Sequence, residues 1–379
     1  LLGLGLVMNA SASGAVAIVN ELNQYHYFIR HVVYAFFGLG VAAAVLLVPM
    51  SYWRRLGWPL LILSFLLLGL VFIPGIGHEA NGSKRWIDFG VFKLQSSELA
   101  KLFLVLFIAG YIERYKKELQ EKSLNFLKPL LIVAGVAVMT LIEPDYGATV
   151  VLLVSAAVMV FMANARLKSA LMAASALVAI GFFTIYLEEY RVERLQNLMD
   201  PWGDQFGSGY QLTPALIAFG RGEWFGTGLG NSIQKQFYLP EAHTDFVFAV
   251  LAEEFGIIGS LLTLSVFVFV CFRAFQIGRW AEHLQLFFIA YFAYGIALLW
   301  SIQGFINIGV NLGMLPTKGL TLPFISYGGS SLISCCIGMA ILLRIEWEVR
   351  QFRLRQQSGV IVSKPKPTSL ANKEVIHAR

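Results

Sequence analysis

Apolar side chains fill most of this chain in long runs that few charged residues interrupt. A helix that crosses a bilayer needs about 20 apolar residues. By this criterion the runs predict about ten membrane-spanning helices, near 1–13, 31–50, 58–74, 96–113, 127–142, 147–164, 167–187, 246–272, 283–307 and 329–346. The pattern therefore predicts an all-α integral membrane protein. Because Leu1 already lies inside an apolar run, we expect the first helix to begin before it.

Composition supports this class and excludes others. Hydrophobic residues make up 57% of the chain and charged residues only 14%, whereas soluble proteins carry about 25% charged residues. A soluble enzyme, a disordered hub and a nucleic-acid-binding module are therefore excluded, and we expect no nucleic-acid partner. The net charge of +6 is explained by basic cytoplasmic loops. The three cysteines lie in or beside apolar runs, where small packing residues are expected.

The distribution of Lys and Arg predicts the orientation in the membrane. The basic segments 51–57, 114–128, 164–168 and 273–283, and the tail from 344 onward, are expected in the cytoplasm. Both termini then lie there, with a membrane domain at 1–350 and a basic tail at 351–379. The basic residues left on the other side or at its helix ends are Arg30, Lys84, Arg85, Lys93, Lys101, Arg191, Arg194, Arg221, Lys235 and Lys318.

The extracytoplasmic segments are longer and richer in Gly, Trp and Pro. The largest, about 188–245, separates the seventh and eighth predicted helices, and connections longer than about 15 residues are usually functional or disordered. Its many aromatic residues argue against disorder. Within it, Tyr190–Met199 and Gln211–Phe219 are expected to form short interfacial helices, with Leu212, Ala215, Leu216 and Phe219 on one face of the second.

Four extracytoplasmic segments concentrate polar residues, at 81–101, 143–147, 238–256 and 311–331. The third contains Pro-Glu-Ala-His-Thr-Asp-Phe and then Ala-Glu-Glu-Phe-Gly, and the fourth contains Leu-Pro-Phe-Ile-Ser-Tyr-Gly-Gly-Ser-Ser. These motifs resemble the SEDS family (shape, elongation, division and sporulation) of polytopic membrane proteins, over essentially the whole chain. The version with Pro-Thr-Lys-Gly-Leu-Thr at 316–321 resembles the cell-division branch more than the elongation branch.

The resemblance implies a fold of ten helices and the activity of a peptidoglycan glycosyltransferase that polymerises lipid II. It implies a multi-pass protein of the bacterial inner membrane, acting at the division septum. A class B penicillin-binding protein, a transpeptidase of the FtsI type, is the implied partner, together with the divisome proteins FtsQ, FtsB and FtsL and membrane lipids. The family's catalytic aspartate falls on Asp245 of the His-Thr-Asp-Phe motif.

The chemistry of this reaction agrees with that position. A sugar hydroxyl is a weak nucleophile at neutral pH, so a carboxylate base near it helps. Pyrophosphate is a good leaving group, and cations can stabilise it. Asp245 precedes the eighth predicted helix, on the side where the exceptional cations lie. The alternative is a helix-capping charge stabilised by the helix dipole, which would lower the pKa of this carboxyl unless burial offsets it.

Eight further residues are candidates for substrate binding: Arg85, Lys93, Glu98, Lys101, Lys235, Glu241, His243 and Ser326. Glu98 and Lys101 are three positions apart, close enough on a helix to pair. They are either an ion pair that lets two charges enter the membrane or a cavity-lining cation held by its carboxylate. Trp86 is expected to anchor at the interface or to stack on sugar. Glu253 and Glu254 follow in the eighth helix, as cavity residues or as paired structural charges.

No protein metal site is expected, because the histidines are scattered. A Mg²⁺ or other divalent cation bridging Asp245 or Glu241 to pyrophosphate stays open, since such ions need only one or two carboxylates. Two other functions also stay open, a lipid II flippase and a non-catalytic scaffold of the divisome. The polar groups cluster at the outer ends of the helices and no internal repeat is visible, which disfavours transport.

Overall fold

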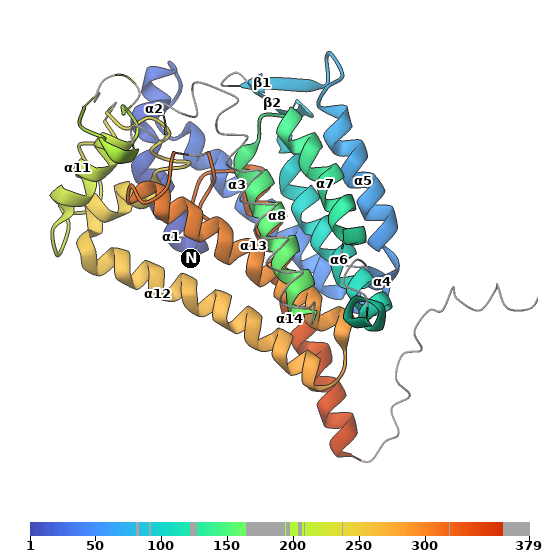
Figure 1. The fold of residues 1–379 in the computed structure, drawn as a ribbon. Helices are drawn as coiled ribbons and strands as arrows, with labels where there is room; N and C mark the ends of the chain where they lie inside the picture. The colour runs from blue at the N-terminus through green and yellow to red at the C-terminus, as the bar shows by residue number, and fades with distance from the viewer. Residues whose placement is uncertain are drawn as a thin grey trace, which may run out of the picture.

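The computed structural model describes residues 1–358 apart from 81–82, 91, 122–126, 164–193, 195–197, 204–206, 208, 237 and 318. The predicted span at 167–187, most of Tyr190–Met199 and the tail beyond 358 lie outside the described residues, as does Lys318. The described chain is mostly helical (Figure 1). Its helices are α1 (Leu2–Ala12), α2 (Gly14–Val19), α3 (His26–Leu47), α4 (Met50–Arg55), α5 (Gly57–Leu70), α6 (Ser96–Glu121), α7 (Leu127–Ile142), α8 (Tyr146–Met162), α11 (Leu212–Gly222), α12 (Val247–His283), α13 (Phe287–Asn311) and α14 (Gly329–Gln357).

Every predicted span that falls on described residues coincides with one of these helices. Three of them, α3, α12 and α13, are long and apolar enough to cross a membrane by length and composition. The apolar helices α1, α5, α7 and α8 are shorter. The protein is therefore an integral membrane protein.

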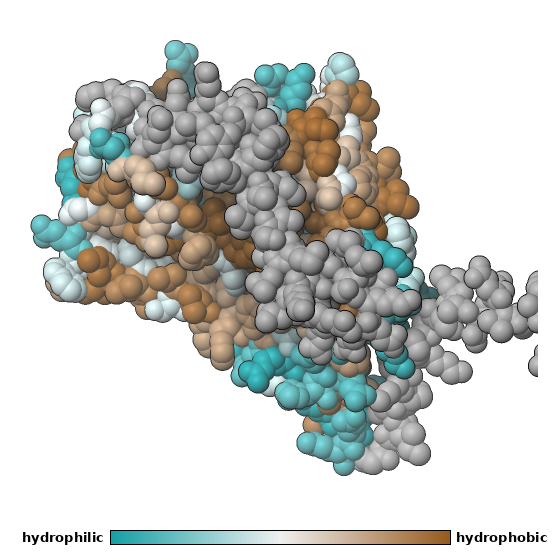
Figure 2. Space-filling model, in the orientation of Figure 1, coloured by the Kyte–Doolittle hydropathy of each residue, from teal (hydrophilic) through white to brown (hydrophobic). Residues whose placement is uncertain are grey.

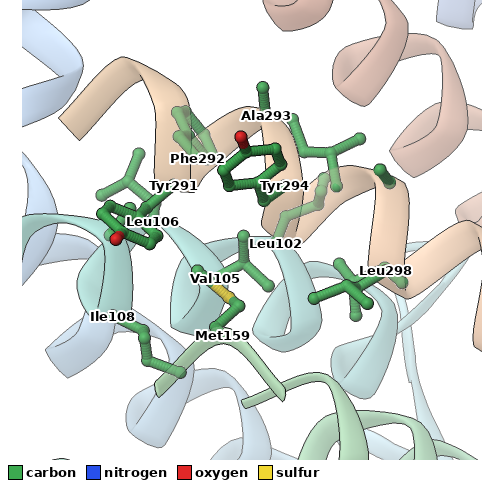
Figure 3. Packing of buried hydrophobic residues seen from close by; sticks show 14 of the residues in the cluster. Leu102, Val105, Leu106, Ile108, Met159, Tyr291, Phe292, Ala293, Tyr294 and Leu298 are labelled. Atoms are coloured by element: carbon green, nitrogen blue, oxygen red, sulfur yellow. The ribbon is translucent and has the colours of Figure 1, made fainter. Parts of the chain in front are cut away.

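The interior is built around α13, which packs against α6, α8 and α12. Figure 3 shows Leu102 and Val105 of α6 and Met159 of α8 against the aromatic residues at the start of α13. Gly295 lies at this crossing, and a Cβ added there would stand 2.2 Å from Val105 Cγ1 and 2.8 Å from Met159 Sδ. Only a residue without a side chain lets these helices approach so closely, as is typical of helix packing in membranes.

The outer surface carries apolar side chains in the middle of the bundle and polar ones at its two ends (Figure 2). Phe36 of α3 and Phe269 of α12 are 73% and 62% exposed. Exposed apolar area of this extent is unusual on a soluble protein. It is expected where the solvent is lipid.

The prediction of an all-α fold is wrong at one end of the bundle. β1 (Gly77–Ala80), β2 (Ser83–Asp88) and β3 (Lys93–Gln95) form an antiparallel sheet in the order β1-β2-β3. Burial along β2 follows the two-residue period of a strand, because Ser83 and Ile87 are buried while Lys84 and Asp88 are exposed. The sequence analysis treated this segment only as a polar loop. The end of the bundle that carries this sheet and α11 is called the sheet end.

The start of α12 is shaped by a kink at Gly256, whose φ is +66°. A Cβ at this position would lie 2.5 Å from Gly226 N and 2.6 Å from Trp224 C. Both the positive φ and these short distances therefore exclude any residue other than glycine. The segment that follows α11 packs into the kink, where Thr227 N and Gly228 N donate to the carbonyls of Glu253 and Glu254, at 2.9 and 3.0 Å. The expected helix at Gln211–Phe219 is confirmed as α11.

Candidate active site

A cavity of about 980 Å³ opens at the sheet end of the bundle. Its walls come from six parts of the chain. They are the start of α3, strands β2 and β3 with the residues after each, the connection between α7 and α8, residues 194 and 210–211 before α11, the residues just before α12, and the segment 319–331. The tertiary fold thus brings all four polar segments of the sequence to one hollow.

Asp245 lines this cavity, just before the helix cap Phe246 of α12. A Cβ added at Gly319 would lie 3.3 Å from Asp245 Oδ2, so the carboxyl group lies against the segment 319–331. The pKa of Asp245 is raised to about 7, mainly by burial and then by the negative charge of Glu241, while the positive charge of Arg85 acts in the opposite direction. Burial therefore outweighs the lowering expected from the helix N-terminus. A carboxylate with a pKa near 7 is well suited to general base catalysis at neutral pH.

Glu241 supplies a second carboxylate to the lining. Thr244 Oγ1 donates to Glu241 Oε2 at 2.6 Å, and the main-chain N–H groups of Thr244 and Phe246 donate to Glu241 O. Glu241 itself has a φ of +54°, a backbone conformation that is costly for a residue with a side chain. The tight turn 241–246 directs both Glu241 and Asp245 to the cavity.

Arg85 and Lys93 bring positive charge to the same walls. Arg85 Nη2 donates to Pro144 O at 2.7 Å and to Ser83 Oγ at 3.0 Å, and its Nε donates to Glu143 O at 3.3 Å. Lys93 Nζ donates to His78 Nε2 at 2.7 Å. These acceptors are neutral groups that fix the position of the cations without cancelling their charge. The cations can therefore still bind an anion in the cavity.

The sequence analysis missed Asp145, which also lines the cavity. Asp145 Oδ1 accepts from Ala148 N at the start of α8, and its Oδ2 accepts from Gln95 Nε2 at 2.9 Å and Ser97 Oγ at 2.8 Å. The neighbouring Glu143 is fully buried, and burial raises its pKa to about 8. The polar segment 143–147 was the signal for this wall, although its residues were given no role.

Arg30 and Arg194 line the cavity as well, and neither was named as a site residue. Arg194 Nη1 donates to the carbonyl of Thr317, which ties it to the segment before Gly319. Both had been counted among the few basic residues outside the cytoplasm. Because no motif surrounds either residue, their expected place outside the cytoplasm was the one feature of the sequence that pointed to the site.

Five of the eight residues predicted to bind substrate do not line the cavity. Lys101 Nζ lies 2.9 Å from Glu98 Oε1 and 2.6 Å from Gln303 Oε1, and both charges are buried inside the bundle. This geometry corresponds to the buried ion pair of the two alternatives. Lys235 Nζ is likewise bound to Glu254 Oε1 at 2.6 Å and to Ser11 Oγ at 2.7 Å.

The other two lie beside the cavity rather than in its lining. His243 is buried next to Tyr327, with ring centroids 5.3 Å apart, and its carbonyl accepts from Tyr327 N at 2.9 Å. Ser326 Oγ accepts from Leu322 N at 2.7 Å and shapes a turn. A role of these five residues in binding stays a prediction, whereas Arg85, Lys93 and Glu241 do line the cavity.

Glu253 belongs to the structural framework around the site. It is fully buried and accepts from Ser232 Oγ at 2.5 Å, from Ile233 N at 3.0 Å and from Gln234 N at 3.2 Å. Arg221 Nε lies 3.3 Å from Glu253 Oε1, the oxygen that also accepts from Ile233 N. The carboxylate holds the segment after α11 against α12, so the interpretation as a structural charge holds for Glu253 and Glu254 alike.

Among the described residues, no three His, Cys, Asp or Glu side chains come together as a metal site. The lining carboxylates Asp145, Glu241 and Asp245 come from two walls of the cavity. One or two of them suffice for Mg²⁺ that is also held by substrate phosphates. The donor set therefore fits such an ion only together with a phosphate-bearing ligand.

Known proteins resemble this chain along most of its length. The family model FTSW_RODA_SPOVE, described as "Cell cycle protein", matches residues 1–351. A probable peptidoglycan glycosyltransferase FtsW of Pseudomonas fluorescens is 56% identical over 351 residues, which are 92% of this chain and 86% of that protein. The protein of the same name from Marinobacter nauticus is 49% identical over 94% of this chain and 89% of its own length.

Solved structures agree with the fold. A chain from a study of how a peptidoglycan synthase complex coordinates polymerization and crosslinking superposes with a TM-score of 0.71 at 28% identity, covering 92% of this chain and 98% of its own. The rod shape determining protein RodA of Thermus thermophilus gives a TM-score of 0.62 at 27% identity, covering 90% and 95%. The family match and these relatives show that the chain belongs to the FtsW/RodA/SpoVE family of cell cycle proteins, which is the SEDS family that its motifs resemble.

Proposed function

We propose that this protein is a peptidoglycan glycosyltransferase that polymerises lipid II into glycan strands at the division septum. The observation that carries the proposal is the half-buried Asp245 with a pKa near 7 in a cavity lined by Arg30, Arg85, Lys93 and Arg194. The names of the relatives support the activity. Lipid II joins a sugar to a membrane-embedded chain through pyrophosphate, so its enzyme needs a base and cations together at a membrane surface.

The distribution of charge supports an orientation with the sheet end outside the cytoplasm. The opposite end of the bundle, where α4 and the last turns of α14 lie (Figure 1), carries Arg54 and Arg55 on α4 and Arg350, Arg353 and Arg355 on α14. Basic residues concentrate on the cytoplasmic side of membrane proteins. The cavity then faces the space in which peptidoglycan is built. The C-terminal tail lies in the cytoplasm, and a tenth helix in 167–187 would place the N-terminus there as well.

The proposed reaction uses Asp245 as general base. Its carboxylate takes the proton of the acceptor sugar hydroxyl while that oxygen forms a bond to the anomeric carbon of the donor. The bond from this carbon to the pyrophosphate oxygen breaks, and the pyrophosphate leaves with the electron pair. Arg85 and Lys93 stabilise the negative charge that develops on the pyrophosphate. This electrostatic stabilisation is strongest in a partly buried site.

A divalent cation would have only an auxiliary role in the proposed reaction. Asp245 or Glu241 would hold it together with the pyrophosphate, and it would supply further positive charge to the leaving group. The partner is proposed to be a class B penicillin-binding protein, because a structural relative belongs to a complex that coordinates polymerization and crosslinking. FtsQ, FtsB and FtsL are proposed as further partners.

The experiment is polymerisation of purified lipid II by this protein together with its penicillin-binding partner. Asp245→Asn keeps the shape of the side chain and removes the base, so we expect the rate to fall by about 10²- to 10⁴-fold. Asp200→Asn is the matched control, because Asp200 is exposed and accepts a hydrogen bond from Gly203 N in its own turn. A rate for Asp245→Asn equal to that of the wild type would refute the proposal. Lipid translocation by the protein alone in liposomes, without polymer, would favour the flippase.

A further inference from the structure

Three buried amides form a stripe along α13 that the sequence analysis did not single out. Gln303, Asn307 and Asn311 are spaced by four residues, so their side chains lie on one face of the helix. Their exposed fractions are 4%, 1% and 0%. Amides buried to this extent need hydrogen-bond partners, and the partners identify what the stripe holds.

Asn307 and Asn311 bind the main chain of the proposed base. Asn307 Nδ2 donates to Asp245 O at 2.8 Å, and Asn311 Nδ2 donates to the same oxygen at 2.9 Å. Asn311 Oδ1 also accepts from Ala249 N in the first turn of α12, at 3.1 Å. Two amides of α13 therefore fix the start of α12 at the residue that carries the carboxyl group.

Asn307 also binds the opposite wall of the cavity. Its Nδ2 donates to Leu320 O at 2.6 Å, next to Gly319, which faces the carboxyl group of Asp245. One turn earlier on α13, Gln303 Nε2 donates to Thr321 O at 2.9 Å. A single amide thus sets the distance between the proposed base and the segment that lies against it.

The orientation of the Asn307 amide is set by its partners. Both oxygens near Nδ2 are main-chain carbonyls, which only accept hydrogen bonds. The other end of the amide, Oδ1, is buried and has no hydrogen-bond partner in the described part of the chain. Asn307→Asp would replace the donor Nδ2 by a carboxylate oxygen, which repels the carbonyl oxygens of Asp245 and Leu320. The volume of the side chain stays almost the same.

We propose that Asn307, assisted by Asn311, is a positioning residue of the glycosyl transfer and sets the place of Asp245 against the segment 319–321. The inference rests on the proposed function, because it assigns these amides to the proposed base. A displacement of about 1 Å at a reacting group costs about 100-fold in rate. Substrate contacts elsewhere in the cavity do not pass through these amides, so KM stays constant while kcat falls.

The test compares Asn307→Asp, Asn311→Ala and the control Asn231→Asp in the lipid II polymerisation assay with the partner present. Asn231 is exposed, and its side-chain amide donates to Thr227 O within its own turn. We expect kcat of Asn307→Asp to fall about 100-fold with KM within twofold of the wild type. In Asn311→Ala the amide of Asn307 still binds the carbonyl of Asp245, so kcat should fall only about tenfold. The kcat of the control should stay within twofold of the wild type. Activities are divided by the folded fraction, measured by thermal unfolding in detergent.

A kcat within threefold of the wild type per folded molecule, or a loss that lies in KM, would overturn the proposal. If Asn307→Asp does not fold, Asn311→Ala decides by the same two criteria. The wider proposal fails separately, since it requires Asp245→Asn to be inactive. An inactive Asp245→Asn with a fully active Asn307→Asp would leave the enzyme assignment intact and refute only the positioning role.

Discussion

Arg85 in the cavity and the arginines at the α4 end of the bundle have opposite kinds of partner. At the end with α4, Arg54 lies 2.8 Å from Glu113, Arg273 lies 3.2 Å from Glu346, and Arg344 lies 2.8 Å from Glu348. At the sheet end, Arg85 is bound by carbonyl and hydroxyl oxygens. The same residue type is neutralised by a carboxylate at the α4 end and held by neutral acceptors in the cavity.

This difference separates structural charge from charge kept for a ligand. A cation paired with a carboxylate has little attraction left for an anion. A cation held by carbonyl dipoles is fixed in place with its full charge. The buried pairs Glu98–Lys101 and Lys235–Glu254 belong to the first kind, although Glu98, Lys101 and Lys235 were candidates for substrate binding. The distinction predicts that variants of paired charges mainly lose stability, whereas variants of cavity charges mainly lose activity.

Lys101→Met should have the largest effect on stability. It leaves Glu98 buried without its partner, and breaking a buried pair costs about 3–5 kcal/mol of unfolding free energy. Thermal unfolding in detergent measures the loss. The double variant Glu98→Gln with Lys101→Met should regain most of it, because both charges are then absent. A single variant as stable as the wild type would show that the pair is not structural.

Arg85→Gln should mainly affect activity. It removes a cation of the cavity, and we expect the polymerisation rate at low lipid II concentration to fall about 10- to 100-fold, as for lost charge-assisted hydrogen bonds of about 1.5–3 kcal/mol. Arg273→Gln is the matched variant at the other end, where Glu346 also pairs with Arg350. It should keep the rate within twofold. Equal losses in the two variants would remove the distinction between the ends.

The pH dependence tests the electrostatics around Asp245. The base form of the carboxyl group increases as pH rises, so the rate should rise with pH and reach half of its plateau near pH 7. Glu241→Gln removes a negative charge that raises the pKa of Asp245, so the midpoint should move to lower pH. Arg85→Gln should move it to higher pH. Shifts in the same direction would contradict the assignment of the profile to Asp245.

Arg350→Ala should have the smallest effect. Its guanidinium lies 2.7 Å from Glu346, but the side chain is 66% exposed. Exposed pairs of this kind contribute at most about 1 kcal/mol. Unfolding experiments should show a loss below that value and no change in polymerisation. A larger loss would mean that the paired end is held together by its ion pairs.

Much of the fold could be predicted because lipid imposes a simple rule on the sequence. A membrane helix is mostly apolar along its length, and nine of the predicted apolar runs coincide with helices of the described chain, which are α1, α3, α5, α6, α7, α8, α12, α13 and α14. The sheet of β1, β2 and β3 was missed. Its strands are short, and their alternation of buried and exposed residues is weak beside the polar residues of the turns.

The site was predicted in part for a similar reason. Asp245, Arg85, Lys93 and Glu241 stand in motifs or in polar segments, and all four line the cavity. Arg30, Arg194 and Asp145 needed the fold, because each comes from a different part of the chain. Lys101 and Lys235 lie outside the lining, in pairs with Glu98 and Glu254, because a sequence does not reveal which carboxylate a lysine will contact.

The membrane environment, the helices and the motif that carries the carboxyl group could be predicted, because they depend on the order of residues over short stretches. Which charges are paired and which face the cavity became known from the packing of the helices. The packing also decided that the two asparagines of α13 hold the carbonyl of Asp245, from 62 and 66 positions away along the chain. Contacts of this kind depend on how the helices pack, and no local pattern encodes the packing.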